Sequence, residues 1–160
     1  RKDYFEKVDE KPTDSFLYML AMNTFTMNTS MNPFENTLSS DKLFNKQAEV
    51  IQEIADKDDC IIVGRCAGYI LRDEPKCVRI YISADKDFRT KRIMASDHLD
   101  EKEAQKKIHS MDKKRDSYFG YYAGQDWKAC HTYDLSISTS SLGIDKAVDL
   151  ICQYIDIKFK

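Results

Sequence analysis

Arginine and lysine side chains occur at three places where they could bind phosphate groups. Gly64-Arg65 follows a short apolar run, and Arg89 and Arg92 stand three residues apart, on one face of a predicted helix. The densest group runs from Lys106 to Arg115, with four lysines and one arginine in ten residues. A transferring phosphoryl group carries negative charge that such cations stabilise when water is excluded. Phosphoryl transfer is therefore one chemistry that these residue types fit.

Each group also has an interpretation without catalysis. The Arg65 guanidinium is a planar fork that matches phosphate, and Gly64 lets the backbone approach a ligand, but Arg65 could equally be a surface residue paired with Asp73. Arg89 and Arg92 also fit a solvated helix face.

The basic run leads into aromatic residues that end at Tyr122. It could form a lid that closes over a reaction, a solvated helix with its aromatic rings packed beneath, or a patch that grips single-stranded nucleic acid. Acidic residues interspersed with the cations disfavour nucleic acid: Glu101, Glu103, Asp112 and Asp116.

Composition limits the remaining possibilities. The chain has 160 residues, which is one domain's worth, and a net charge of -2, so no global field attracts nucleic acid or an acidic membrane. Five scattered cysteines and no signal peptide predict a reducing, cytoplasmic location, and no apolar run is long enough to span a membrane. No Cys/His spacing indicates a metal site.

Strands and helices alternate in the predicted pattern. Apolar runs predict strands at Cys60–Val63, Cys77–Ile82 and Tyr133–Ser138. Helical periodicity covers about 41–56, a segment after Ser83 or Asp85 that carries Arg89 and Arg92, then about 101–122, and a closing segment from Ile144 to Ile155. Such alternation predicts an α/β fold with a parallel sheet, whose ligands bind beyond the carboxyl ends of the strands.

The first forty residues are less regular. A short helix is predicted over Ser15–Met22. The stretch Asn23–Ser40 is rich in polar residues and is predicted to form a loop or flap.

Four motifs in register resemble the cytidylate kinase-like family, in the nucleoside monophosphate kinase group of P-loop kinases. Val63-Gly-Arg-Cys66 resembles the family's Gly-Arg-Asp after its third strand, and Ile80–Arg92 resembles the next strand and arginine-bearing helix. Asp112-Lys-Lys-Arg115 resembles the lid signature Asp-x-x-Arg. Tyr133–Ile144 resembles the last strand and the turn beside the adenine. The resemblance covers about residues 60–155.

The resemblance implies a three-layer P-loop kinase fold with a parallel sheet, a helical lid and an acceptor-binding arm. Residues 1–160 would form a single kinase domain. Residues 1–40 would belong to the arm, 41–100 and 131–160 to the core, and about 101–127 to the lid.

The resemblance also implies roles. Gly64, Arg65 and Asp112 would bind the acceptor nucleotide, and Arg92, Lys114 and Arg115 would be catalytic, neutralising charge around the transferring group. Ser138 and Thr139 would lie near the ATP base. ATP is the co-substrate and brings Mg²⁺, so the chain itself supplies no metal site. The partners would be small nucleotides, with no membrane and no nucleic acid.

Three departures from the family pattern stand out. Cys66 replaces the Asp after Gly-Arg, and Ile108 replaces a lid arginine, with Lys107 as a candidate stand-in. The sequence contains no G-x-x-x-x-G-K-[ST] phosphate loop, which the family carries on an earlier strand; we expect that loop upstream of Arg1.

The resulting hypothesis is ATP-dependent phosphoryl transfer to a nucleoside monophosphate, most specifically CMP or dCMP. The alternatives are a catalytically altered relative that binds nucleotide as a regulator, and a kinase for another small acceptor.

Overall fold

The structure is a computed structural model that describes residues 33–160, with side chains from Asp41 onward. The predicted helix at Ser15–Met22 and most of the predicted arm lie outside the described residues. The chain divides into two compact units, residues 1–63 and residues 64–160.

The described part of the first unit is mostly one helix, α2 (Pro33–Lys57). Ile51 and Gln47 are buried on it. A helix was predicted from about residue 41, with a loop before it, so the loop prediction is wrong for residues 33–40. Proline is favoured at a first helical position, and the polar residues that follow have only weakly unfavourable helix propensities. The composition of this stretch therefore did not determine its structure.

Cys60–Val63 was predicted to be a buried strand, and that prediction is wrong for this structure. The segment is a loop in which Ile61 is 88% and Val63 67% exposed. An apolar run becomes a strand only where another strand accepts its backbone hydrogen bonds. In the described part of the chain the only strands are two that pair with each other.

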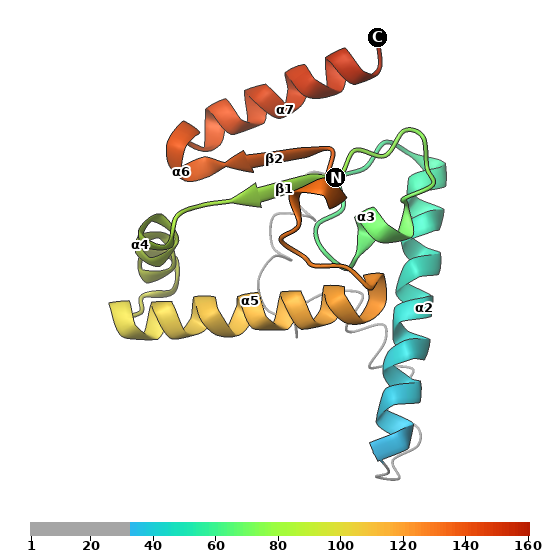
Figure 1. Ribbon diagram of the computed structural model, residues 1–160, viewed down its shortest axis with the longest axis horizontal. Helices are drawn as coiled ribbons and strands as arrows, with labels where there is room; N and C mark the ends of the chain where they lie inside the picture. The colour runs from blue at the N-terminus through green and yellow to red at the C-terminus, as the bar shows by residue number, and fades with distance from the viewer. Residues whose placement is uncertain (1–32) are drawn as a thin grey trace. The chain divides into compact units, whose positions relative to one another are not determined.

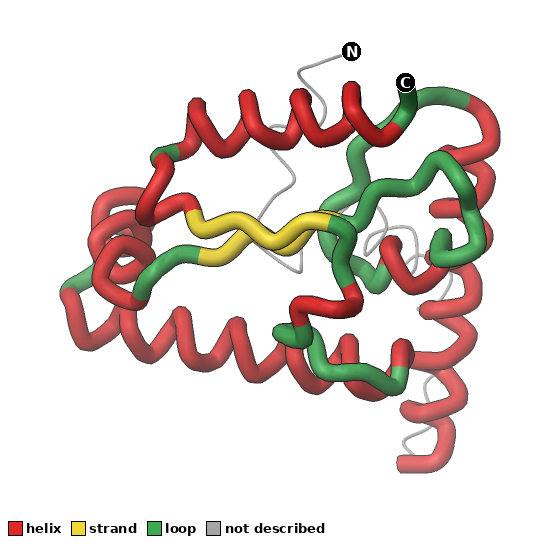
Figure 2. Tube along the Cα trace, turned by 45° about the horizontal axis from the view of Figure 1, so that its top comes forward, coloured by secondary structure: helices red, strands yellow, loops and turns green. Residues whose placement is uncertain are grey.

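Those two strands lie in the second unit and are parallel. β1 (Ile80–Ser83) pairs with β2 (Leu135–Ser138), and the register runs from Ile80 opposite Leu135 to Ser83 opposite Ser138. Both were predicted, a few residues longer at their amino ends. The strand pair lies between α7 (Ile144–Lys158) and α5 (Glu101–Ala123) (Figures 1 and 2). The observed architecture is thus helix-rich, with a small parallel sheet.

Helices of the second unit follow the predicted pattern. α4 (Lys86–Asp97) leaves the carboxyl end of β1, and α5 and α7 are each within a few residues of their predicted bounds. Short turns are α3 (Ala67–Ile70), η2 (Cys130–Thr132) and α6 (Thr139–Leu142). Asp100 begins α5 with a capping box: its carboxylate accepts from the Glu103 amide at 2.8 Å, and Glu103 accepts from the Asp100 amide at 3.1 Å. None of the described helices is long and apolar enough to cross a membrane.

Candidate functional site

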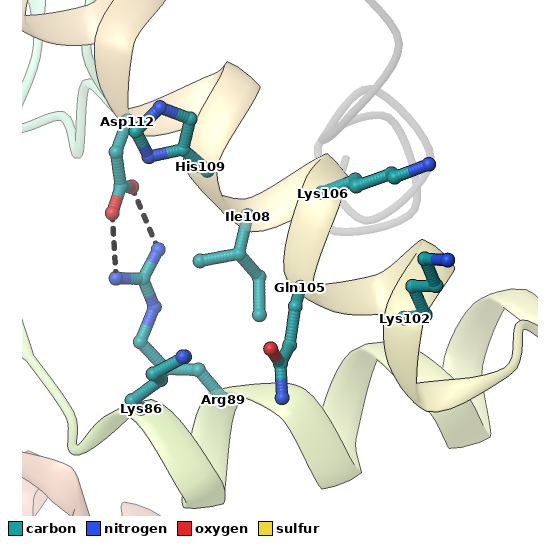
Figure 3. A pocket seen from close by; sticks show the side chains of 8 residues that line it. All are labelled: Lys86, Arg89, Lys102, Gln105, Lys106, Ile108, His109 and Asp112. Atoms are coloured by element: carbon teal, nitrogen blue, oxygen red, sulfur yellow. Dashed lines mark hydrogen bonds and ion pairs between the residues drawn. The ribbon is translucent and has the colours of Figure 1, made fainter.

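An ion pair joins α4 to α5 at the centre of the candidate site. Both terminal nitrogens of Arg89 donate to the carboxylate of Asp112, each at 2.7 Å (Figure 3). Burial by itself would raise the pKa of Asp112, but the hydrogen bonds and charge of Arg89, with the charges of Arg115 and Lys128, outweigh it and hold the pKa below its usual value. Asp112 is therefore a carboxylate at neutral pH, and it occupies the planar fork of Arg89.

Arg115 is the second cation at this carboxylate. It follows Asp112 by one helical turn, and its Nη1 lies 3.7 Å from Asp112 Oδ1. On its other side the guanidinium carbon stands 6.0 Å from the centre of the Trp127 ring. Trp127 in turn packs edge-on against Tyr81 of β1, with ring centres 5.7 Å apart. The position of Arg115 therefore depends on an aromatic cluster next to the sheet.

Arg65 occupies a strained turn. Gly64, Arg65 and Cys66 have φ values of 70°, 55° and 56°, three successive residues in the left-handed region. Side chains with a Cβ disfavour this region, and such strain gathers at ligand sites. Burial raises the pKa of Tyr118 on α5 to about 12, and the Arg65 charge close by opposes part of that rise. Tyr118 follows Arg115 by one turn, so Arg65 lies close to the part of α5 that follows Arg115.

Cys66, which stands where the family has an aspartate, points inward. It is 6% exposed, and burial raises the pKa of its thiol to about 11. The thiol is therefore uncharged at neutral pH and packs as a small apolar group.

A pocket of about 540 Å³ lies between α4 and α5, beside the Arg89–Asp112 pair. Lysines line it from both helices: Lys86 from α4, and Lys102 and Lys106 from α5 (Figure 3). Ile108, at the position where the resemblance implies a lid arginine, also lines it. Lys107, the candidate stand-in for that arginine, instead donates to Asp97 at the end of α4. The lining of the pocket thus includes several cationic side chains and the apolar side chain of Ile108.

Two residues predicted to be catalytic stand apart from this cluster. Arg92 and Lys114 are exposed, and no ion pair joins either to a described residue. Lys114 follows Asp112 by two residues, which turns it toward another face of α5. On α4 it is Arg89, three residues before Arg92, that meets Asp112.

Ser138 and Thr139 lie at the carboxyl end of β2, as predicted. Their hydroxyls hold neighbouring chain segments together: Thr139 Oγ1 donates to the Ser83 carbonyl at 3.1 Å, and the hydroxyls of Ser138 and Ser140 lie 2.9 Å apart. The Asp85 amide donates to Ser140 Oγ at 3.1 Å. These contacts fasten the two loops that leave the carboxyl ends of the strands.

Sequence reasoning missed the central role of Arg89 and the pocket lysines Lys86 and Lys102. Their spacing in the sequence could have indicated them. Lys86 and Arg89 are about one helical turn apart, as are Lys102 and Lys106, and the two pairs lie on consecutive helices that one loop connects. Within residues 33–160 no group of three or more His, Cys, Asp or Glu side chains is placed to hold a metal ion.

Comparisons with known proteins place the chain among related sequences. Residues 1–141 match the model of the cytidylate kinase-like family. The chain is similar to a cytidylate kinase of Sulfolobus acidocaldarius, with 31% identity over 69% of this chain and 60% of that protein. It is also similar to one of Methanoculleus marisnigri, with 27% identity over 69% of this chain and 59% of that protein. The chain therefore spans about three fifths of the curated relatives that it matches.

A solved structure has a similar fold. The crystal structure of an uncharacterized protein from Eubacterium ventriosum superposes with a TM-score of 0.70 and 37% sequence identity, covering 72% of this chain and 73% of that one. The match to the family model extends over most of the sequence. The chain belongs to the cytidylate kinase-like family.

Proposed function

We propose that the protein transfers the γ-phosphoryl group of ATP to a nucleoside monophosphate, with CMP or dCMP as the acceptor. The observation that carries this proposal is the meeting of Arg89 and Arg115 at Asp112, beside a cationic pocket that opens where α4 leaves β1. Ligands of parallel α/β folds bind at that end of the strands. Membership of the family and the cytidylate kinases among its relatives support the same activity.

The proposed chemistry is positioning and charge neutralisation, with no covalent intermediate. Arg65 holds the acceptor phosphate, with Gly64 allowing close backbone approach. Arg115 releases Asp112 and binds the transferring phosphoryl group in its place. Asp112 then orients this arginine or contacts the acceptor. Arg92 and Lys114, which are exposed here, reach the phosphates only if the segment 101–127 closes as a lid, which is the motion we propose for it.

We assign the chain to a three-layer P-loop kinase fold with residues 1–40 in the acceptor arm. The ATP base would lie beside Ser138 and Thr139. These residues would contact it through backbone atoms and packing, because their hydroxyl groups already have hydrogen-bond partners. Mg²⁺ would arrive bound to the ATP phosphates. ATP and nucleoside monophosphates are cytoplasmic metabolites, so the reaction would take place there.

The test is phosphoryl transfer by the full-length protein, with ATP–Mg²⁺ against CMP, dCMP, UMP, AMP and GMP, following ADP release. We expect preferential turnover of CMP or dCMP. Turnover of none of the five, with ADP release no faster than without acceptor, would contradict the proposal.

One observation favours a second candidate, a nucleotide-binding regulator. The inward-facing Cys66 and the apolar Ile108 remove two polar groups that the family pattern places near the acceptor. Calorimetry separates the two candidates: tight CMP binding without turnover supports the regulator, and turnover supports the kinase.

A further inference from the structure

Asp112 alone does not fix the orientation of the Arg115 guanidinium. Both oxygens of Asp112 accept from Arg89 at 2.7 Å, whereas the contact with Arg115 is 3.7 Å long. An N–H···O hydrogen bond spans about 2.7–3.2 Å, so the contact with Arg115 is an ion pair without a hydrogen bond. The Arg115 side chain is also 47% exposed, and a long side chain with that exposure keeps much of its rotamer freedom unless a neighbour restricts it. A second contact is needed to hold Arg115 in one orientation.

Trp127 supplies a contact of the required kind. The guanidinium carbon of Arg115 stands over the Trp127 ring, 6.0 Å from its centre, which is about the outer limit of a cation–π interaction. A ring attracts the flat guanidinium through its face and leaves the N–H groups at the edge of the guanidinium available to an anion. A carboxylate would occupy those donors. Trp127 can therefore restrict Arg115 without competing with a phosphoryl group.

Trp127 is itself held by residues of both strand segments. The Tyr81 ring of β1 meets it edge-on, with ring centres 5.7 Å apart and ring planes at 82°. Tyr133, two residues before β2, donates from its hydroxyl to the Trp127 carbonyl at 2.7 Å, and its ring centre lies 5.0 Å from that of Tyr81. Burial raises the pKa of Tyr81, and the charge of Asp112 adds to that rise while the charge of Arg115 opposes part of it. The aromatic cluster therefore lies within electrostatic reach of the ion pair and ties Trp127 to the sheet.

We propose that Trp127 is a positioning residue that holds the Arg115 guanidinium beside Asp112, where the transferring phosphoryl group would take the place of the carboxylate. The inference rests on the proposed function, which assigns the transferring group to Arg115. Trp127 would act through that arginine without touching either nucleotide. Loss of the ring would leave Arg115 on α5 but spread its guanidinium over several orientations, so transfer would suffer more than acceptor binding.

Kinetics of the full-length protein with ATP–Mg²⁺ and CMP test this proposal. Trp127→Leu removes the ring and keeps an apolar side chain, and Trp127→Phe keeps a ring face. Trp127→Leu should lower kcat about fivefold and change the KM for CMP less than about twofold, and Trp127→Phe should keep kcat within about twofold of the wild type. Each variant is assayed below its thermal unfolding transition.

A double-mutant cycle separates positioning from a general effect on the fold. In the Arg115→Ala background, Trp127→Leu should lower kcat less than about twofold further, because the group through which Trp127 acts is missing. A residue that only supports the fold would lower kcat by the same factor with or without Arg115. Equal losses in the two backgrounds would overturn the inference.

Indole fluorescence tests the contact without any reaction and does not require Trp127→Leu to fold. The emission of Trp127 is isolated by subtracting the spectrum of the matching Trp127→Phe variant. Arg115→Ala should change the intensity and the maximum of this emission, because it removes a charge from the ring face. Lys113→Ala, which removes an exposed charge two residues earlier on α5, is the matched control and should leave the emission unchanged. Identical emission in wild type, Arg115→Ala and Lys113→Ala would overturn the inference.

The two measurements also separate this inference from the kinase assay. An emission change specific to Arg115→Ala, in a protein that phosphorylates none of the five nucleotides, supports the positioning of Arg115 by Trp127 and contradicts the kinase. Turnover of CMP with equal losses from Trp127→Leu in both backgrounds supports the kinase and overturns the positioning role.

Discussion

Two aspartates of the second unit, Asp112 and Asp134, each receive a forked contact from an arginine, but their surroundings differ. Asp134 accepts from Arg79 Nε at 3.1 Å and from the Arg79 backbone amide at 2.7 Å, and Lys158 Nζ lies 3.5 Å away. Its own amide donates to the Arg79 carbonyl at 2.8 Å. These bonds fix the chain just before β1 to the chain just before β2.

Asp112 has side-chain partners in place of backbone ones, and it borders a pocket. Both carboxylates are 18% exposed, so burial does not distinguish them. An ion pair that includes the backbone can open only if the strands separate. One made by side chains can open while its helices stay in place, so its arginines are available to another anion. From this difference we propose that Asp134 stabilises the fold and that Asp112 can exchange its arginines with a bound anion.

The largest effect expected from this comparison is on catalysis. Arg115→Ala should lower kcat by about 10²–10³-fold, since it removes a charge that stabilises the transferring group. The free energy of unfolding should change by less than about 0.5 kcal/mol, because the side chain is exposed. Steady-state kinetics and urea unfolding measure the two quantities, with Lys146→Ala as control. Near wild-type kcat in Arg115→Ala would remove Arg115 from the site.

The opposite pattern is expected at the other aspartate. Asp134→Asn should lower the free energy of unfolding by about 1–3 kcal/mol, the cost of leaving half-buried donors without their charged acceptor. Its kcat, measured where the variant is fully folded, should match that of the wild type. Asp112→Asn is the paired variant. If it destabilises the protein as much as Asp134→Asn does, the assignment of the two carboxylates to different tasks fails.

A dependence on pH should mark the same difference. Hydrogen bonds from Arg79 lower the pKa of Asp134 from 3.8 to about 2. A lowered pKa in the folded state gives stability that is present above pH 3.8 and is lost as the pH falls toward 2, in total about 2 kcal/mol. Urea unfolding at pH 5, 4, 3 and 2.5 should therefore show the gap between wild type and Asp134→Asn closing as pH falls. A difference in the free energy of unfolding that stays constant with pH would mean that the charge of Asp134 does not contribute to stability.

The smallest effect concerns the acceptor. Arg65→Ala should raise the KM for the monophosphate about tenfold, equivalent to about 1.4 kcal/mol for one charge-assisted contact. Its kcat should fall less than about threefold, because the contact exists before and during transfer. Initial rates at varied acceptor concentration decide this. An unchanged KM would exclude Arg65 from the acceptor site.

Local periodicity predicted the parts of the fold that local sequence controls. Apolar residues at helical spacing predicted the bounds of α5 and α7 within a few residues. Short apolar runs did the same for β1 and β2. Cys60–Val63 has an equally apolar pattern, but a strand also needs a neighbour, and no property of the segment itself supplies one.

The sequence pointed to several residues of the candidate site but not to the contacts between them. Gly64-Arg65 and the Asp112–Arg115 turn could be found by motif, because their spacing is local. Helical periodicity could not rank Arg89 against Arg92, since both fit one helix face, and the resemblance pointed to Arg92. The packing of α4 on α5 shows that Arg89 is the arginine that binds Asp112. For the same reason the sequence did not show that Lys107 pairs with Asp97 rather than lining the pocket.

The left-handed turn at Gly64–Cys66 has a consequence for how the protein tolerates change. Glycine at position 65 would relieve the steric cost of φ 55°, and it would also delete the guanidinium that we assign to the acceptor phosphate. Position 65 is thus a site of trade-off between stability and activity. Selection for thermal resistance alone would drive Arg65 toward glycine, and selection for turnover would retain the strained arginine.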